Sequence, residues 1–599
     1  MKSKLYRKFI CYILATVISF GMAACGSLPP ESSSDDSSWY SSEDSSVEEE
    51  SSSFLEESSS EEESSSSLEE TSSEEESSSE EESSSSSEET SSEEESSSSS
   101  EESSSKEESS SSSEDSAPEA SSSNSSEDSS VEDSSSFEEF LENGMPNYDA
   151  LSADEMIFAG WRAPDSLTKD AYQEFKDCGF NYLFLNGKNL SANGANIETA
   201  LGFCADLGIK SFVDAGGYED MIYELADRYQ KYESFAGFNY DEPVIYDNTI
   251  MNKRKGLITM SRYAEGLATN YDNVAFLANL NPQEAVNYNW GTPAFTYEEY
   301  LDALTTYICT PYANSDSRAI NWISCDSYPL RYDTAYTPSM FLKDIWLQNL
   351  GYLAVVKRDS TMDLTSNFFI KSMTEEDTAN RQSGQFRIPT YNDIRLQLYT
   401  LMAFGYDSAS FFCYASPPAG GQFEFSEGSF AMIDSDGNKT SVYTASQQAI
   451  AEIKKFSHTY MQFNDGWKGV YPVIGTNHGV KRSDYTNLEK LGTETVSLKS
   501  AVITSATLSR NGVTDITSTE DVIVGVMTDN YRNPGFMVVN YNDSTLNKTA
   551  STQITFNTKK YDKAWVYING VQHEKTLTDG KLTLNLGVGE GVFVVPIKK

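Results

Sequence analysis

Short apolar runs alternate with helix-like segments between about residue 146 and residue 468. The runs end in polar residues, and the segments between them carry apolar residues at 3.6-residue spacing. Eight runs have the length and composition of buried strands: 157–161, 182–185, 211–214, 235–240, 274–279, 320–325, 367–372 and 409–414. Eight strand-then-helix units over about 300 residues predict an α/β fold, a (β/α)₈ barrel spanning 143–468. A doubly wound sheet is the alternative, but no Gly-rich phosphate-binding fingerprint accompanies these units.

Two of the intervening helices carry clear end signals. Apolar residues at 197, 201 and 204 are followed by Gly208, and those at 394, 398 and 401 by Gly405. Glycine just past the last periodic residue is typical of a helix end. Thr390 and Asp393 have the spacing of a capping box, so they predict the start of the second helix.

The pattern changes again after Gly469. Strand-like runs dominate at 496–498, 522–527, 535–541, 553–556, 564–568, 582–586 and 592–596, with turn signals at Asn542-Asp543 and Asn569-Gly570. Residues 469–599 are therefore predicted to form an all-β sandwich.

The first 25 residues have the organisation of a targeting segment. Four basic residues precede an apolar core over 9–20 that is too short to span a bilayer by itself. Residues 22–25 (MAAC) resemble the lipobox of bacterial lipoproteins, which implies a lipid on Cys25 and a place on the outer face of the cell membrane. An ordinary cleaved signal with an accidental cysteine is the alternative.

Residues 26–142 consist almost entirely of serine and acidic residues. Forty acidic residues and one lysine lie between 31 and 142, so this segment contributes most of the net charge of −50. Such a composition cannot bury apolar surface, and we expect a disordered, self-repelling stalk. The acidic balance therefore says little about the substrate of the domains that follow.

Several kinds of chemistry are made improbable by the residues at the predicted strand ends. The chain has three histidines, at 458, 478 and 573, and none falls at a strand end of the barrel. That argues against a histidine zinc site or a Ser-His-Asp triad there. The cysteines after the targeting segment show no metal-ligand spacing, and buried free thiols are favoured over a Cys178–Cys204 bridge. We expect no cofactor, no metal and no nucleic-acid partner.

The strand ends instead carry carboxylates, amides and aromatic rings. Carboxylates transfer protons and stabilise an oxocarbenium-like centre, while flat rings cover the apolar faces of sugars. The candidate residues for binding a sugar are Trp161, Arg162, Asp214, Tyr240, Asp241, Asn279, Tyr328, Lys371 and Tyr414. This set predicts a carbohydrate site at the carboxyl face of the barrel.

Four passages resemble glycoside hydrolases of clan A. Residues 175–181 (FKDCGFN) are similar to the passage from the first helix to the second strand, and 237–243 (GFNYDEP) to the fourth-strand Asn-Glu-Pro motif. Residues 433–440 with Tyr443 look like the loop before the last helix, and 589–594 like the closing strand of an accessory β domain. The resemblance implies that Glu242 is the general acid/base.

The chain departs from that clan at two positions. Asp241 stands where the clan has Asn, and Lys371 lies nearest the place of the strand-7 nucleophile. Asp326, at the end of strand 6, is the leading candidate for the second carboxylate, with Glu376 (or its neighbour Glu375) in reserve. A carboxyl separation of about 6.5–9.5 Å would predict inversion, and about 5–5.5 Å retention.

These observations lead to one main hypothesis and two alternatives. The main hypothesis is hydrolysis of glycosidic bonds in an extracellular polysaccharide or oligosaccharide by a lipid-anchored, monomeric surface protein. A barrel that captures glycans without cleaving them, for uptake or adhesion, is the first alternative. A purely structural scaffold is the second, and it leaves the polar barrel mouth unexplained.

Overall fold

The computed structural model describes residues 139–151, 154–245, 255–283, 297–307, 320–331, 342–374, 386–417, 429–477 and 501–599. Several predicted features lie outside these ranges. They are the lipobox with Cys25, the acidic segment up to 138, Glu375, Glu376 and the strand predicted at 496–498. Among the described helices, none combines the length and the apolarity needed to cross a bilayer.

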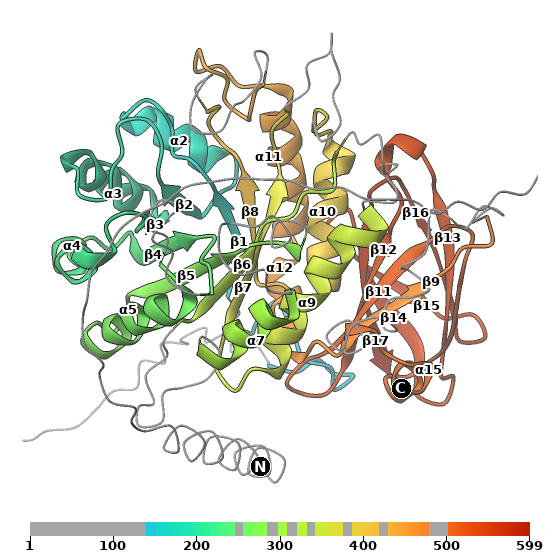
Figure 1. Ribbon diagram of the computed structural model, residues 1–599. Helices are drawn as coiled ribbons and strands as arrows, with labels where there is room; N and C mark the ends of the chain where they lie inside the picture. Colours follow the sequence, from blue (N-terminus) through green and yellow to red (C-terminus); the bar gives the residue numbers. More distant parts are fainter. Residues whose placement is uncertain are drawn as a thin grey trace, which may run out of the picture. The chain divides into compact units, whose positions relative to one another are not determined.

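Eight parallel strands form a closed barrel in chain order, as predicted (Figure 1). They are β1(Ile157–Gly160), β2(Tyr182–Leu185), β3(Lys210–Asp214), β4(Phe235–Asp241), β5(Ala275–Leu280), β6(Trp322–Cys325), β7(Thr365–Lys371) and β8(Ser408–Phe412). The barrel closes where β8 pairs with β1, from Ile157 opposite Ser408 to Gly160 opposite Phe411.

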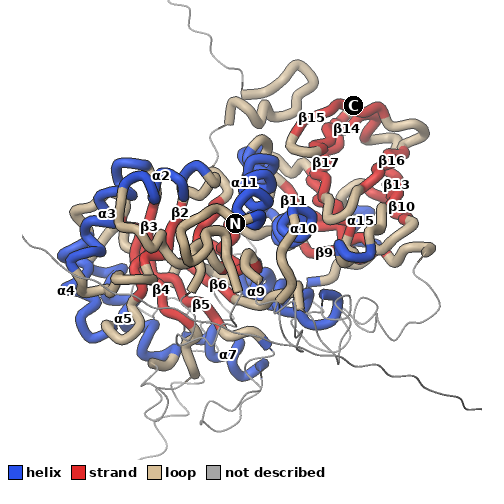
Figure 2. Tube along the Cα trace, turned by 90° about the horizontal axis from the view of Figure 1, so that it is seen from above, coloured by secondary structure: helices blue, strands red, loops and turns tan. Residues whose placement is uncertain are grey.

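Helices surround these strands, as the view from above shows (Figure 2). They are α2(Lys169–Asp177), α3(Ala195–Leu207), α4(Ile222–Tyr229), α5(Leu257–Asn270), α7(Tyr297–Tyr307), α9(Leu347–Asp359), α10(Tyr391–Ala403) and α11(Ser441–Lys454). Helix α3 ends at Gly208 in the left-handed conformation, and Thr390 with Asp393 forms the predicted capping box of α10. Both end signals are therefore confirmed.

Alternate side chains of the strands point into the barrel and outward against the helices. Ala159, Phe184, Phe212, Leu277 and Phe369 pack together inside the barrel. Their sequence neighbours on the same strands pack in the larger core under the helices. The interior is therefore filled by side chains, and only the strand ends can hold a substrate.

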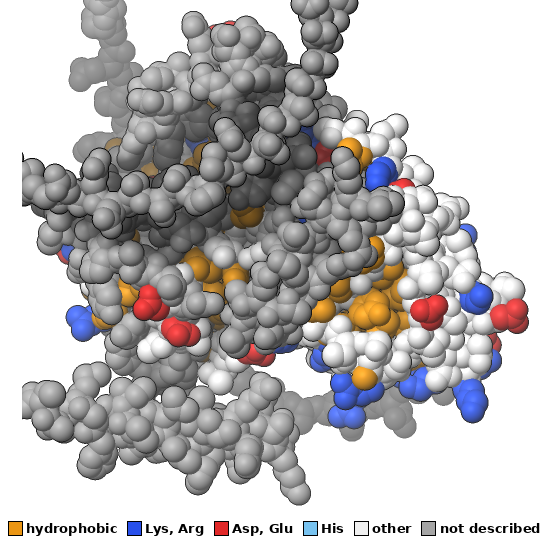
Figure 3. All heavy atoms as spheres, turned by 45° about the vertical axis from the view of Figure 1, so that its right-hand side comes forward, with side chains coloured by type: hydrophobic (Ala, Val, Ile, Leu, Met, Phe, Trp, Pro, Cys, Tyr) orange, Lys and Arg blue, Asp and Glu red, His pale blue; other side chains and the backbone are white. Residues whose placement is uncertain are grey.

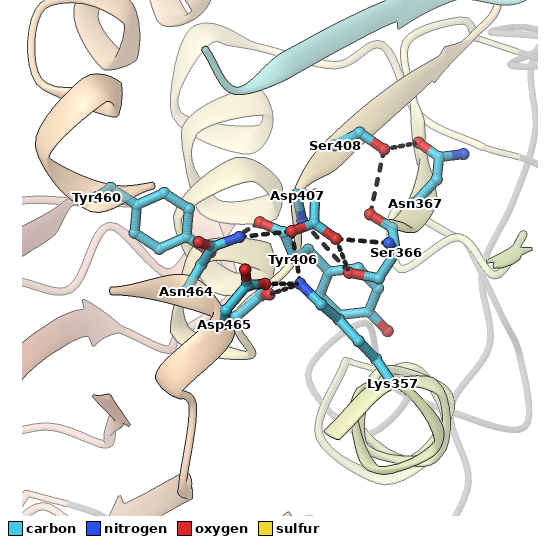
Figure 4. A network of polar contacts seen from close by, with 10 residues as sticks. Lys357, Ser366, Asn367, Tyr406, Asp407, Ser408, Tyr460, Asn464 and Asp465 are labelled. Carbon is cyan, nitrogen blue, oxygen red and sulfur yellow. Dashed lines mark hydrogen bonds and ion pairs between the residues drawn. The ribbon is translucent and has the colours of Figure 1, made fainter. Parts of the chain in front are cut away.

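The amino ends of β7 and β8 are held by a buried polar network (Figure 4). Asp407 accepts hydrogen bonds from Lys357 Nζ at 2.5 Å, from Asn464 at 2.5 Å and from the Ser366 backbone N–H at 2.6 Å. Lys357 also pairs with the exposed Asp465 at 3.0 Å. This network gives the buried carboxylate of Asp407 several hydrogen-bond donors. It lies at the face opposite the strand carboxyl ends, which in such barrels contributes to stability.

The C-terminal domain consists of two antiparallel sheets, as predicted. One has the order β10-β13-β16, and the other β15-β14-β17-β12-β11-β9. The strands are β9(Gly469–Val473), β10(Val513–Ser518), β11(Val522–Thr528), β12(Pro534–Asn540), β13(Ala550–Phe556), β14(Tyr561–Ile568), β15(Val571–Thr576), β16(Lys581–Leu586) and β17(Gly591–Lys598).

The larger sheet, apart from its exposed edge strand β15, is buried on both faces. One face packs on the smaller sheet, through residues such as Val524, Val538 and Ile554. The other face belongs to the same apolar core as the barrel helices. A Cβ on Gly525 would lie 2.1 Å from the Ala403 carbonyl oxygen, and one on Gly591 2.4 Å from the Tyr399 ring. These glycines let α10 lie directly on the sheet.

Replacing Lys357 by methionine tests the network at the amino ends of β7 and β8. The substitution leaves Asp407 buried without its cation, so we expect the free energy of unfolding to fall by about 3 kcal/mol. Lys563→Met is the matched control, because Lys563 forms an exposed pair with Glu574 at 2.6 Å and should change stability by less than about 1 kcal/mol. Urea unfolding would measure both, and equal losses would contradict the assigned role of Lys357.

Candidate active site

The carboxyl end of β4 presents Asp241 toward the barrel interior. Phe238 and Tyr240 pack outward in the helix-side core, so the alternation of β4 turns Asn239 and Asp241 inward. Asp241 lies opposite Asn279 of β5. Glu242 follows with a positive φ of 46°, and its backbone N–H donates to the Asn279 carbonyl oxygen at 2.7 Å. The strand therefore ends with two successive carboxylates at the mouth.

Asn279 connects two carboxylates from different strands. Its amide nitrogen Nδ2 donates to Asp241 Oδ1 at 2.7 Å and to Asp326 Oδ1 at 3.2 Å. The two oxygens can be no farther apart than the sum of these distances. The Asn279 amide therefore holds these two carboxylates close together.

Tyr328 lies among the same carboxylates. Burial raises the pKa of its hydroxyl well above the usual range, and the negative charges of Asp326, Asp241 and Glu242 add to the rise. The hydroxyl therefore stays protonated at any physiological pH. All three acidic residues therefore lie close enough to Tyr328 to act electrostatically on its hydroxyl.

Lys371 occupies the carboxyl end of β7, and its side chain is enclosed by aromatic rings. Its Nζ lies 3.9 Å from the ring centre of Phe386, 4.9 Å from that of Phe412 and 5.0 Å from that of Tyr328. A cation held over ring faces in this way is stabilised by their quadrupoles. The cage places a positive charge beside Tyr328 and hence beside the carboxylates.

Trp161 lies half-buried at the carboxyl end of β1. Its ring centre is 5.0 Å from that of Phe184 and 5.5 Å from that of Phe369, so the indole caps the aromatic interior of the barrel. Its neighbour Arg162 has a positive φ of 69° and forms an ion pair with Asp165 at 2.9 Å. Trp161 has the position of a platform for a sugar ring, while Arg162 is already engaged locally.

Asp214 ends β3, next to β4 in the barrel. Burial raises the pKa of its carboxyl group to about 6. The Gly216 backbone N–H, which donates to Oδ1 at 3.0 Å, opposes the rise, and the charge of Glu219 adds to it. Asp214 therefore exchanges a proton close to neutral pH, unlike an ordinary surface aspartate.

Three asparagines at the mouth have buried amide atoms. Asn186 and Asn239 were not among the predicted site residues, whereas Asn279 was predicted only to bind the sugar. Asn239 is fully buried, and neither its Oδ1 nor its Nδ2 has a hydrogen-bond partner among the described residues. Within the same part of the chain, Asn186 Oδ1 and Asn279 Oδ1 are also buried without a partner. Buried polar atoms need a partner, so this concentration favours a site that takes up water or ligand hydroxyls. The sequence feature that could have identified Asn239 as a site residue is an asparagine within an otherwise apolar strand.

Two predicted stacking residues lie in the core instead of at the mouth. Tyr240 points outward, and its hydroxyl accepts from the Lys255 backbone N–H at 2.9 Å. Tyr414 is fully buried, with its ring centre 4.8 Å from that of Phe175. Both positions lack access to a ligand in the barrel, so neither residue is carried into the proposed site.

The described ranges contain no group of three or more His, Cys, Asp or Glu side chains arranged to hold a metal ion. Cys178, Cys204, Cys325 and Cys413 are buried free thiols, so Cys178 and Cys204 are not bridged. Burial raises the pKa of the Cys204 thiol to about 12, which makes it a poor nucleophile at neutral pH.

Comparisons with known proteins find resemblance in structure alone. No family model and no curated protein matches the chain. A β-galactosidase of the psychrophilic Marinomonas ef1 aligns at 10% identity with a TM-score of 0.37, over 57% of this chain and 66% of that one. An α-L-arabinofuranosidase of Thermotoga maritima aligns at 11% identity and 0.38, over 74% of this chain and 96% of that one. A β-L-arabinopyranosidase of Geobacillus stearothermophilus aligns at 9% identity with a TM-score of 0.40, over 75% of this chain and 97% of that one.

This chain thus spans about two thirds of the β-galactosidase. Likeness with TM-scores below 0.5 does not identify the activity of this chain. Its function has to be inferred from the groups at its own barrel mouth.

The raised pKa of Asp214 predicts a pH dependence of stability. The native state holds a proton up to about pH 6, whereas an unfolded aspartate releases it near pH 3.9, so the free energy of unfolding falls as pH rises between these values. Asp214→Asn removes this dependence. We expect the stability of the variant relative to the wild type to rise by about 2–3 kcal/mol from pH 4 to pH 7.

Urea unfolding across that pH range would measure the effect. Asp302→Asn, on the exposed face of α7, is the control and should leave the pH profile unchanged. Parallel profiles for Asp214→Asn and the wild type would show that Asp214 titrates normally.

Proposed function

We propose that this protein hydrolyses glycosidic bonds in an extracellular polysaccharide or oligosaccharide. The observation that carries the proposal is the amide of Asn279, which holds Asp241 and Asp326 together at the strand end that Glu242 follows. Three carboxylates in a site walled by aromatic rings suit a reaction that needs a proton donor and an anion near a developing oxocarbenium centre.

Each carboxylate has a distinct role in the proposed reaction. Glu242 protonates the oxygen of the leaving group, and Asp326 is the second carboxylate that faces the anomeric carbon. Asp241 shares the Asn279 amide with Asp326, so it fixes the position of that carboxylate and adds negative charge. In the retaining form of the reaction, Asp326 attacks the anomeric carbon and water later releases the sugar.

Other residues at the mouth bind the substrate in this proposal. Trp161 stacks on the apolar face of a sugar ring, and the unpaired oxygens of Asn186 and Asn279 accept hydrogen bonds from hydroxyl groups. Asp214 and Tyr328 complete the polar rim. The same proposal includes a lipid on Cys25, the acidic stalk, a location on the outer face of the cell membrane and a monomeric state. These four parts rest on the sequence.

Capture of a glycan without cleavage is the second candidate function. Lys371 favours it, because a caged cation stands at the strand end where the resembling hydrolases keep a nucleophilic glutamate. A caged lysine can bind an acidic or hydroxyl-rich ligand but cannot replace a carboxylate nucleophile.

Glu242→Gln tests the proposed acid. We expect the purified protein to release sugar from at least one member of a panel of plant, host and bacterial glycans. The substitution removes the proton donor and should lower kcat by about 10²–10⁴-fold. Glu224→Gln, exposed on α4, is the matched control and should keep the wild-type rate. Reducing-sugar release would measure all three proteins.

Asp326→Gly tests the second carboxylate. If Asp326 is the nucleophile of a retaining enzyme, azide should restore turnover of an activated substrate and give a glycosyl azide of inverted configuration. If azide instead restores the turnover of Asp241→Gly, Asp241 is the nucleophile and Asp326 is the positioning residue. Absence of hydrolysis in the wild type, with glycan binding intact in Glu242→Gln, would establish capture and exclude the hydrolase.

A further inference from the structure

Four segments that are distant in sequence enclose a basic pocket in the C-terminal domain. They are the end of α15(Ser505–Arg510), the turn between β11 and β12, the residues before β14 and the end of β17. The pocket has a volume of about 360 Å³. Its cationic lining residues are Arg510, Arg532, Lys559, Lys560, Lys598 and Lys599. Figure 3 shows Lys and Arg side chains gathered on this domain.

None of these six cations is paired with an acidic side chain in the described residues, and none of the described acidic side chains lines the pocket. Other lysines of the same domain are paired, such as Lys548 with Glu520 at 2.9 Å and Lys563 with Glu574 at 2.6 Å. Like charges gathered around one cavity raise its positive potential, and a bound anion would lower the repulsion between them.

The pocket also has an apolar wall. Tyr561 and Pro534 are buried and line it, and the Tyr561 ring is fixed by packing against Gly512 and Phe556. A fixed ring beside several cations suits a sugar that carries an acidic group. The ring covers the apolar face of the sugar, while Arg and Lys hold its carboxylate or sulfate.

The charge of the remaining chain makes this pocket distinctive. Most of the net charge of −50 comes from residues 26–142, so that segment repels a polyanion. Glu139 accepts a hydrogen bond from Tyr531 at 2.7 Å and is not among the residues that line the pocket.

We propose that this pocket binds an acidic unit of an anionic polysaccharide, through its carboxylate or sulfate group. The site is separate from the carboxylates of the barrel mouth, so the proposal stands whether or not the barrel cleaves glycans. It gives the C-terminal domain a binding role that retains acidic polymers on the protein.

Calorimetric titration of the full chain tests the proposal. The protein would carry Glu242→Gln, so that hydrolysis does not obscure binding. The probes are polygalacturonate for carboxylate groups, chondroitin sulfate for sulfate groups, neutral dextran and poly-L-glutamate. Arg510→Gln/Lys560→Gln removes two exposed cations of the pocket. Lys563→Gln/Lys575→Gln removes the same charge from the same domain outside the pocket.

We expect binding of at least one acidic glycan and none of dextran. The pocket variant should bind at least tenfold more weakly, the control pair within twofold of the parent, and affinity should fall from about 50 to about 200 mM salt as screening increases. Binding of polygalacturonate alone would assign carboxylate groups, and chondroitin sulfate binding would assign sulfate.

Other results would overturn the proposal. Equal binding of dextran would remove the role of charge, and equal binding of poly-L-glutamate would remove the role of the sugar. A pocket variant that binds like the control pair would place the site elsewhere. Binding to phosphatidylglycerol vesicles without binding to either acidic glycan would show a membrane contact instead.

Discussion

The pairing of β8 with β1 is the constraint on which the rest of the structure depends. Four residue pairs, from Ile157–Ser408 to Gly160–Phe411, close the sheet on itself. Closure brings all eight strand carboxyl ends to one mouth and alternates their side chains between the interior and the helices. Asp241, Asn279 and Asp326, separated by 38 and 47 residues in the chain, meet because β4, β5 and β6 are neighbours in this sheet. Closure brings Trp161, which follows β1, to 5.5 Å from Phe369 of β7, measured between ring centres.

Buried polar groups are hydrogen-bonded at the amino end of the barrel, whereas several at the carboxyl end have unpaired atoms in the described structure. At the amino end, Asp407 is surrounded by donors and Asn367 accepts from Ser408 at 2.8 Å and Ser410 at 2.9 Å. At the carboxyl end, Asn239 is buried with no hydrogen-bond partner in the described structure, and Asp214 has a pKa of about 6. Saturated polar groups stabilise a fold, whereas unsaturated ones represent a cost that a bound ligand or water can recover. This contrast supports the assignment of the carboxyl end as the functional face.

Helix α10 joins the barrel to the C-terminal domain. Its side chains are buried almost throughout, because one face covers β7 and the other packs on the large antiparallel sheet. Gly525 and Gly591 provide the space for this approach. The sheet thus shields a barrel helix that would otherwise expose apolar surface, while the domain presents its cationic pocket separately. Mechanical support and ligand binding can therefore reside in the same domain.

The sequence by itself determined the elements and their order. Apolar runs between polar ends located all eight barrel strands, and glycine and capping signals located the ends of α3 and α10, because these features depend on local burial and backbone conformation. Strands β9, β10 and β15 of the C-terminal domain were not among the predicted runs. All residues of β15 are exposed, so it carries no apolar pattern. The tertiary structure alone decided which strand-end residues face the barrel. It turned Tyr240 and Tyr414 into the core, caged Lys371 among rings from three segments and bridged two aspartates through Asn279. Residue type and spacing do not specify contacts between distant segments, since these depend on how the sheet closes and twists.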